Sequence, residues 1–145
     1  MMTSVWCMQT MPALEYLKRN GLALRFCPDD IRRDKVAVLT AVKQNMQSFQ
    51  YADASLKRDR DFVLQLIGRN CLTWADASLK CDREFMMKAV RIDGEALAYA
   101  SESLRSDRDI VLAAISKEWY ALRHASKSLL HDREFLLAAV TTNKI

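Results

Sequence analysis

The chain repeats itself every 23 to 25 residues, and this periodicity constrains its fold more than any other feature. A block that reads Asp-Arg-Glu-Phe at Asp82 recurs with small changes at Asp59, Asp107 and Asp132, and a diverged copy begins at Asp34. The intervals between successive Asp residues are therefore 25, 23, 25 and 25 residues. Repeats of this length are typical of chains whose neighbouring units stack to bury a shared core.

Each Asp opens a segment with the spacing of an amphipathic helix. In the clearest copy the apolar side chains are Phe85, Met86, Met87, Ala89 and Val90, which lie on one broad face of a helix and not on one side of a strand. An Asp immediately before such a segment is a favoured N-cap, because its carboxylate accepts the free amides of the first turn. The sequence therefore predicts five structural caps, at Asp34, Asp59, Asp82, Asp107 and Asp132.

A second conserved block follows each first block. It runs from Ala96 to Leu104, and Leu97, Ala100 and Leu104 are spaced i, i+3 and i+7, which predicts a second short helix. The residues 48–56, 71–79 and 121–129 are its copies. The Gly94 that separates the two blocks predicts a left-handed helix stop, because glycine favours that conformation.

A helix of about 10 residues is not stable alone, so pairs of such helices must stack on their neighbours. We therefore predict an all-α fold, a right- or left-handed solenoid of about five helix–turn–helix repeats of about 25 residues each. The 145 residues form one helical-repeat domain in this prediction. Its units are approximately 11–33, 34–58, 59–81, 82–106 and 107–131, followed by a partial repeat at 132–145.

The pattern resembles a family of tandem helical repeats catalogued as domain of unknown function 4116. The shared form is D-R-E-F-V-L-x-A-V-x-x-N-G-x-A-L-x-Y-A-S-x-x-L, and the match is closest from Asp82 to Ser126 within a resemblance that covers roughly 17–140. The chain departs from the form by a two-residue deletion near Asn70 and by Met46 and Trp119 at the turn glycine. The resemblance implies helical repeats and implies no activity.

Composition and cysteine usage exclude several classes of protein. Half of the residues are hydrophobic and 28% are charged, which is typical of a soluble globular domain, and no apolar run is long enough to insert into a membrane. The four cysteines form no C-x-x-C pair, and His124 and His131 have no ligands at metal spacing, so we predict no metal and no cofactor. We expect reduced thiols in an intracellular, cytoplasmic protein, although the sequence does not exclude an organelle.

Residues at the same position of successive repeats form a set, which we call a column. Two columns have both a structural and a functional interpretation. The aromatic column favours packing between repeats over a stacking platform for bases, and it consists of Phe26, Tyr51, Trp74, Tyr99 and His124. The edge of the repeats carries eleven basic and eleven acidic residues, which favours pairs between neighbouring repeats over a continuous positive stripe. If an anion binds, the expected site is the basic edge, which consists of Arg32, Arg33, Lys35, Lys57, Arg58 and Arg60.

The last repeat ends after its first helix, so its outer side has no second helix to meet. Either that helix folds back fully onto the preceding pair, or its outer side contacts another chain. We predict an end-on interface, homotypic or with a partner, at Phe135, Leu136, Leu137 and Val140. The methionine-rich start, which includes Met1 and Met11, is expected to cover the other end or to make a similar contact.

Every recurring residue is explained by packing or capping, which leaves no polar cluster for chemistry. We therefore expect a non-catalytic protein–protein interaction module or scaffold subunit with a protein partner. The alternative is RNA or single-stranded nucleic-acid binding through the basic edge. An enzyme is the third and least favoured class, and the sequence does not identify the partner or the binding face.

Overall fold

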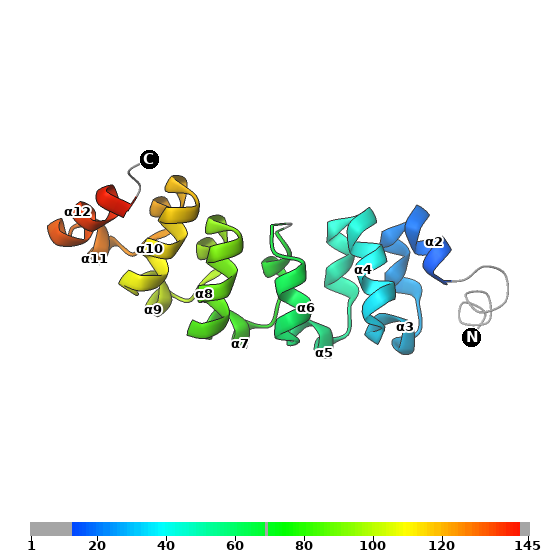
Figure 1. Ribbon diagram of the computed structural model, residues 1–145. Coiled ribbons are helices and arrows are strands. Elements are labelled where there is room, and N and C mark those ends of the chain that lie inside the picture. Colours follow the sequence, from blue (N-terminus) through cyan, green and yellow to red (C-terminus); the bar gives the residue numbers. More distant parts are fainter. Residues whose placement is uncertain (1–12, 69, 143–145) are drawn as a thin grey trace. The chain divides into compact units, whose positions relative to one another are not determined.

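The computed structural model describes residues 13–68 and 70–142 (Figure 1). The chain divides into two compact units, residues 1–63 and 64–145, which are described separately below. All regular elements among the described residues are helices, which confirms the all-α prediction. None of these helices has the length and hydropathy needed to span a bilayer.

Fifteen of the sixteen helical segments among the described residues form five repeats that share one order: a longer α-helix, a 3-10 helix and a short α-helix. The first unit contains α2 (Ala13–Arg19), η1 (Gly21–Phe26), α3 (Asp29–Arg33), α4 (Lys35–Gln44), η2 (Met46–Tyr51) and α5 (Ala54–Lys57), and α6 (Arg60–Gln65) lies at the boundary. The second unit contains η3 (Cys71–Thr73), α7 (Ala77–Lys80), α8 (Arg83–Ile92), η4 (Gly94–Tyr99), α9 (Glu102–Arg105), α10 (Arg108–Lys117), η5 (Trp119–His124), α11 (Lys127–Leu130) and α12 (Arg133–Thr142).

The second block of each repeat differs from the prediction of one short helix. It is divided into η4 and α9 in the clearest copy, because Ala100 and Ser101 are extended, with φ −67° and ψ 154°, and φ −62° and ψ 159°. The spacing of Leu97, Ala100 and Leu104 still places all three in the core. The repeat therefore has three helical segments and not two.

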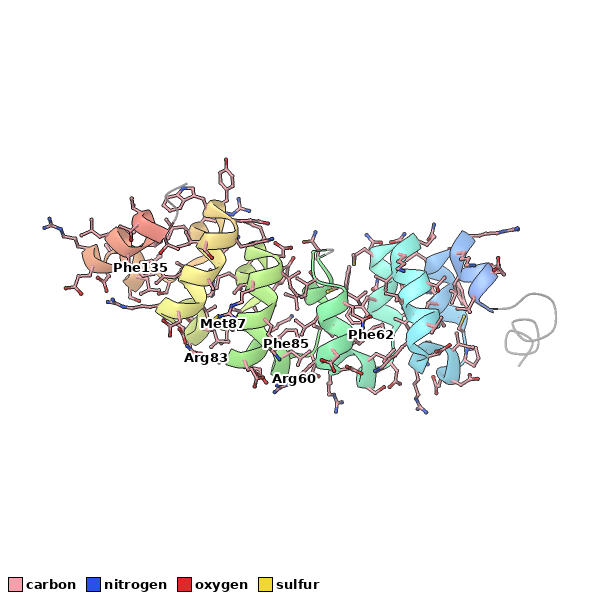
Figure 2. The ribbon with its side chains drawn as sticks, viewed as in Figure 1. Arg60, Phe62, Arg83, Phe85, Met87 and Phe135 are labelled. Carbon is pink, nitrogen blue, oxygen red and sulfur yellow. The ribbon has the colours of Figure 1, made fainter. Side chains whose placement is uncertain are left out.

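The first helices form where the sequence predicts and bury the predicted face. In α8, Phe85, Met86, Ala89 and Val90 are buried, and Met87 is half-buried. The phenylalanine three positions after the Asp is also buried in α6 and α12, as Phe62 and Phe135 (Figure 2). This column is a core column in each unit, because its side chains point at the neighbouring segments of their own repeat stack.

Successive repeats stack in register within each unit. In the first unit α4 packs against α2, and η2 packs against η1. In the second unit α10 packs against both α8 and η4, η5 packs against η4, and α12 packs against α10. Like elements therefore pack on like elements, which is how short helices that are unstable alone obtain a shared core.

A backbone hydrogen bond at the extended turn joins three pairs of consecutive repeats. The Ser101 N–H donates to the Lys80 carbonyl at 3.0 Å, and the Ser126 N–H donates to the Arg105 carbonyl at 3.0 Å. In the first unit the Asp53 N–H donates to the Arg32 carbonyl, also at 3.0 Å. In these three repeats the amide that would continue the 3-10 helix is used by the preceding repeat, at the same residue where the predicted second helix is interrupted.

Gly94 does not adopt the left-handed stop that its position suggested. Only Gly68 and Asn70 have positive φ among the described residues, at 92° and 58°. Gly94 is buried instead at a point of close approach, where an added Cβ would lie 2.6 Å from the carbonyl oxygen of Ala114. Gly21 has the same role in the first unit, where a Cβ would lie 2.3 Å from the Ala41 carbonyl oxygen. Glycine at this position therefore lets the next repeat's helix approach the 3-10 helix.

We predict that Gly94→Ala lowers the free energy of unfolding by about 1–3 kcal/mol, because the new methyl group overlaps a backbone atom that cannot move alone. The measurement is denaturant unfolding followed by circular dichroism. Ala98→Gly, at an exposed position of the same 3-10 helix, is the control and should cost about 1 kcal/mol or less. An unchanged or higher free energy of unfolding for Gly94→Ala would contradict the close approach of residue 94 to the Ala114 carbonyl oxygen.

Ser48 is the one buried polar residue of the described core, and its hydroxyl has no hydrogen-bond partner. The same column contains Ala23, Cys71, Ala96 and Ala121, all of which are buried. We predict that Ser48→Ala raises the free energy of unfolding by about 1 kcal/mol, because an unsatisfied hydroxyl leaves the core. Ser55→Ala, which removes an exposed hydroxyl, is the matched control, and an unchanged or lower midpoint for Ser48→Ala would show that the hydroxyl is satisfied.

Candidate functional site

All five predicted cap residues stand immediately before a first helix. The carboxylate of Asp82 accepts the Phe85 N–H at 3.0 Å, and that of Asp107 accepts the Asp109 and Ile110 N–H groups at 3.0 and 3.3 Å. The other three accept the N–H of Val36, Phe62 and Phe135, in the order Asp34, Asp59 and Asp132. These side chains are therefore committed to the start of the helices.

Three of these carboxylates, those of Asp59, Asp107 and Asp132, receive cations from the preceding repeat. The Arg83 guanidinium lies 2.7 Å from the Asp107 carboxylate and 3.0 Å from that of Asp109. Lys35 pairs with Asp59 at 2.7 Å in the first unit, and Arg108 pairs with Asp132 in the second. Each cation is the first residue of its helix, so the pairs form a ladder along equivalent positions. The hydrogen bond from Arg83 lowers the pKa of Asp107, and the one from Lys35 lowers the pKa of Asp59.

Three of the six residues of the basic edge are paired with carboxylates. Arg32 pairs with Asp29, Arg33 lies 3.5 Å from Asp53, and Lys35 is part of the ladder. The Lys57 ammonium donates to the Gln50 carbonyl at 2.7 Å, and burial lowers its pKa. Arg58 and Arg60 are exposed and also have interactions within the chain. All six cationic side chains therefore already interact with other groups of the chain.

The aromatic column lies at the surface and is not fully packed between repeats. Phe26 is 63% exposed, and Tyr51, Trp74, Tyr99 and His124 are half-buried. In the first unit the Arg25 guanidinium lies over the rings of both Phe26 and Tyr51, at 4.9 and 5.7 Å from their centroids. The residue after each aromatic side chain is small and buried, as expected from the sequence. The column thus covers one edge of the repeats.

A cluster of three side chains that the sequence analysis did not anticipate joins η4 to η5. The Glu95 carboxylate accepts a hydrogen bond from Arg123 at 2.7 Å and lies 3.1 Å from the His124 ring nitrogen. These two partners, His124 first, lower the pKa of Glu95. The sequence could have indicated this cluster, because an acidic and a basic residue stand at nearby positions of consecutive repeats. The same pattern indicates the ion pairs of the ladder.

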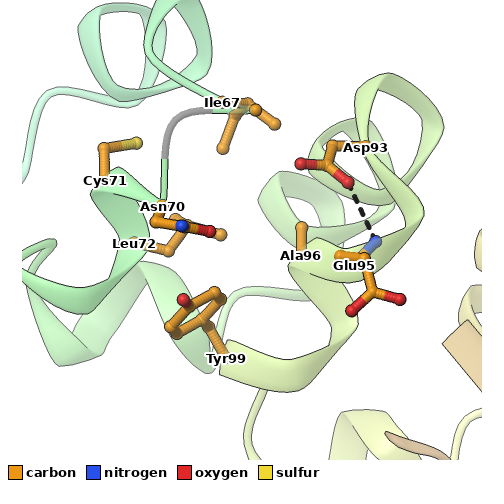
Figure 3. A pocket seen from close by; sticks show the side chains of 9 residues that line it. Ile67, Asn70, Cys71, Leu72, Asp93, Glu95, Ala96 and Tyr99 are labelled. Carbon is orange, nitrogen blue, oxygen red and sulfur yellow. Dashed lines mark hydrogen bonds between the residues drawn. The ribbon is translucent and has the colours of Figure 1, made fainter. Parts of the chain in front are cut away.

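Three free thiols lie in the described part of the chain, and a small pocket lies beside one of them, Cys71. Cys27 and Cys71 are buried, Cys81 is exposed, and burial raises the pKa of Cys71 to about 12. The pocket, lined in part by Ile67, Asp93 and Tyr99, has a volume of about 10 Å³, which is room for about one water molecule (Figure 3). Within residues 13–68 and 70–142 no three His, Cys, Asp or Glu side chains are grouped to hold a metal ion.

The last repeat leaves apolar residues uncovered at positions that other repeats bury. Val140 is 54% exposed, whereas its equivalents Val42, Val90 and Ile115 are 1%, 0% and 0% exposed. Leu137 is 58% exposed, and its equivalents Leu39, Met87 and Leu112 are half-buried. Leu122 and Leu136 are half-buried, although their equivalents Leu97 and Val111 are fully buried. We name Leu122, Leu136, Leu137 and Val140, with the adjoining Leu130 and Arg133, the terminal face.

One residue of the predicted end-on interface does not belong to this surface. Phe135 is buried, because it points inward with Ala139 on the side of α12 that packs against α10. The helix thus folds back onto the preceding repeat with one side and leaves Leu137 and Val140 on the other.

A depression of about 340 Å³ lies beside the terminal face and contains two of its residues. It is lined by Trp119, Tyr120, Leu122, Arg123 and Leu130. Trp119 takes the position that Gly94 has in the preceding repeat, where a side chain would meet the backbone of the next helix. Tyr120 is 76% exposed. The sequence analysis noted Trp119 as a departure from the repeat but did not identify these two rings as surface residues.

We predict that Asp107→Asn, which keeps a capping oxygen and removes the charge, lowers the free energy of unfolding by about 0.3–1 kcal/mol at pH 7. Because Arg83 lowers the pKa of Asp107 in the folded chain, the charged carboxylate stabilises the fold above its unfolded pKa of about 3.9. This contribution is lost as the pH falls through the lowered pKa.

Unfolding curves at pH 7 and at stepwise lower pH values test this, and the difference between wild type and Asp107→Asn should shrink below about pH 4. Arg83→Gln completes a double-mutant cycle. In the Arg83→Gln background, Asp107→Asn should lower the free energy of unfolding by less than it does in the wild type. An equal cost in both backgrounds would show that the ion pair does not contribute.

The comparison with known protein families agrees with the geometry of the repeats. The model of one family, described as a domain of unknown function (DUF4116), matches residues 13–57, 38–80, 59–105, 82–130 and 107–145. No curated protein and no solved structure matches the chain. Three of the five matches begin at the capping residues Asp59, Asp82 and Asp107, so the family's repeat coincides with the structural repeat. The chain therefore belongs to the DUF4116 family of tandem repeats.

Proposed function

We propose that the chain is a non-catalytic protein–protein interaction module, or scaffold subunit, that binds a protein partner through the terminal face. The observation that supports this is the exposure of Val140, at 54%, in a column where Val42, Val90 and Ile115 are at most 1% exposed and Ile67 is half-buried. Apolar side chains that are uncovered together mark interaction surfaces more often than scattered ones. Trp119 and Tyr120 add large, stiff rings of the kind that is enriched at protein interfaces.

The polar residues that recur support a binding role over catalysis. The Asp column is occupied by helix capping and by the ion-pair ladder, and the Glu95 carboxylate is occupied by Arg123 and His124. A catalytic site needs a nucleophile or base whose geometry is directed at a reacting atom. The repeated side chains are directed at their own backbone and at neighbouring repeats instead.

Nucleic-acid binding through the basic edge is the alternative, and the pairing of its residues supports it less well. Neutralised cations release few counterions from phosphate, and counterion release supplies most of the affinity for nucleic acid. A single-stranded oligonucleotide whose mobility shifts with the chain at low salt, and no longer shifts at high salt, would favour this alternative. We also propose an intracellular, cytoplasmic location, in which the free thiols of Cys27, Cys71 and Cys81 stay reduced.

We predict that Val140→Asp, in the tagged full chain expressed in its native cell, removes a defined set of copurifying proteins. A charge in the centre of an apolar contact costs its desolvation, so partners of the terminal face should be reduced at least tenfold. The measurement is quantitative mass spectrometry of proteins bound to wild type and to the variant.

Ile92→Asp is the matched control, because it places the same charge on an exposed apolar residue of an internal repeat. It should retain the set that Val140→Asp loses, and both variants should keep the wild-type thermal midpoint. Recovery of one unchanged set with all three chains would refute a role of the terminal face in binding.

A further inference from the structure

An arginine and two aromatic rings form an exposed site where η1 packs against η2 in the first unit. The Arg25 guanidinium lies over the Phe26 and Tyr51 rings, 4.9 and 5.7 Å from their centroids. Phe26 is 63% exposed, and Tyr51 is half-buried. We name these three side chains the Arg25 site. Because η1 contributes Arg25 and Phe26 and η2 contributes Tyr51, the site is complete within two consecutive repeats of one unit.

The charge of Arg25 is not neutralised within the part of the chain that the structure describes. Its side chain is exposed, and among those residues its guanidinium makes neither an ion pair nor a hydrogen bond. Residues 1–12 contain no Asp or Glu, so their side chains offer no carboxylate either. The two rings restrain the guanidinium through cation–π contacts, and its N–H donors stay available to a ligand.

Stacking of the repeats does not require an arginine at this position. Its equivalents in the later repeats are Gln50, Thr73, Ala98 and Arg123. The 3-10 helices η2 and η4 span the same six positions with Gln50 and Ala98 in place of the arginine. The packing of the repeats therefore does not account for Arg25. Arginine and aromatic side chains are, however, the residues that are enriched at protein interfaces.

A carboxylate is the ligand that this position accepts elsewhere in the chain. Arg123, the one other arginine in the column, binds the Glu95 carboxylate at 2.7 Å. Guanidinium and carboxylate groups are both planar, so they can pair through two parallel hydrogen bonds. Phe26 adjoins the charge, and an apolar side chain next to the ligand's carboxylate would remove the exposed ring from water.

We propose that the Arg25 site binds an acidic peptide segment of a partner protein. An Asp or Glu carboxylate of this segment pairs with Arg25, and a neighbouring apolar side chain packs on Phe26. The helices η1 and η2 contain no acidic residue that would repel such a segment. This inference goes beyond the proposed function, because it assigns a second binding surface that shares no residue with the terminal face.

Single-stranded nucleic acid fits the Arg25 site less well, although bases stack on aromatic rings. Affinity for nucleic acid comes from several phosphate contacts, and each of them needs a cation. Arg25 is the one basic residue of η1 and η2. Lys57, the next cation after η2, donates to the Gln50 carbonyl at 2.7 Å. One available cation matches a single carboxylate and not a run of phosphates.

The first experiment uses the full chain to select ligands from a displayed library of random short peptides. We expect the selected peptides to share an Asp or Glu next to an apolar residue. Selection with Arg25→Gln, which removes the charge and keeps a polar side chain, should lose this shared feature. Arg19→Gln, at another exposed arginine of the first unit, is the matched control and should retain it. If acidic residues are not enriched, or are enriched equally with Arg25→Gln, the inference is wrong.

The second experiment measures the affinity of the most enriched peptide by fluorescence anisotropy. Arg25→Gln should weaken binding by about tenfold or more, because a charge-assisted pair is lost. Phe26→Ala should weaken it by about threefold or more, because the apolar contact is lost. Exchanging the acid of the peptide for its amide should act like Arg25→Gln, and the two changes together should cost less than their sum. Both protein variants should keep the wild-type thermal midpoint, because Arg25 and Phe26 are exposed.

Three further outcomes would replace the proposed ligand or the proposed site. Binding of labelled oligothymidine that Arg25→Gln abolishes, without any enriched acidic peptide, would make nucleic acid the ligand. Binding that tightens about tenfold or more when phosphoserine replaces the acid of the peptide would make phosphate the ligand. A peptide that Val140→Asp no longer binds and Arg25→Gln still binds would belong to the terminal face. That result would support the proposed function and overturn this inference, whereas we expect Val140→Asp to bind the peptide as the wild type does.

Discussion

The structure depends on a backbone amide that a repeat gives to its predecessor, as three of the described repeats do. The N–H groups of Ser101 and Ser126 are not used inside their own helices, because they donate to the carbonyls of Lys80 and Arg105. This bond fixes the register of neighbouring repeats and at the same time ends the 3-10 helix. The short α-helix that follows has only four residues in α9 and α11, too few to be stable alone, so it persists because it is held between repeats.

The sequence was sufficient for features that depend on residues close together in the chain. Asp82 before Phe85 and Met86 predicts a capped helix with a buried face, because capping and helical periodicity are both local. The division of the second block was not predictable in the same way. Leu97, Ala100 and Leu104 have helical spacing whether or not the helix is interrupted, and the Ser101 amide at the interruption donates to a carbonyl about 20 residues earlier in the chain.

The candidate site shows the same limit. Val140 and Leu137 could be identified from an unfinished repeat, but Phe135 could not be separated from them, because α12 is apolar on both sides and only α10 decides which side is covered. Gly94 was assigned to a left-handed turn, whereas its actual constraint is the carbonyl of Ala114 in the next repeat. Trp119 in that same position could therefore be noted as unusual without any indication that it would line a surface depression.

The direction of the ion-pair ladder follows from the requirement for helix caps. A residue at the N-cap must accept hydrogen bonds, so an acid can occupy the Asp107 position and a lysine or arginine cannot. The cation must then come from the repeat before, as Arg83 does, and this order cannot be reversed without uncapping the helix. A stack of such repeats consequently presents carboxylates on one side of each repeat and cations on the other. The two sides are complementary to each other and not to themselves, so consecutive repeats stack in one orientation.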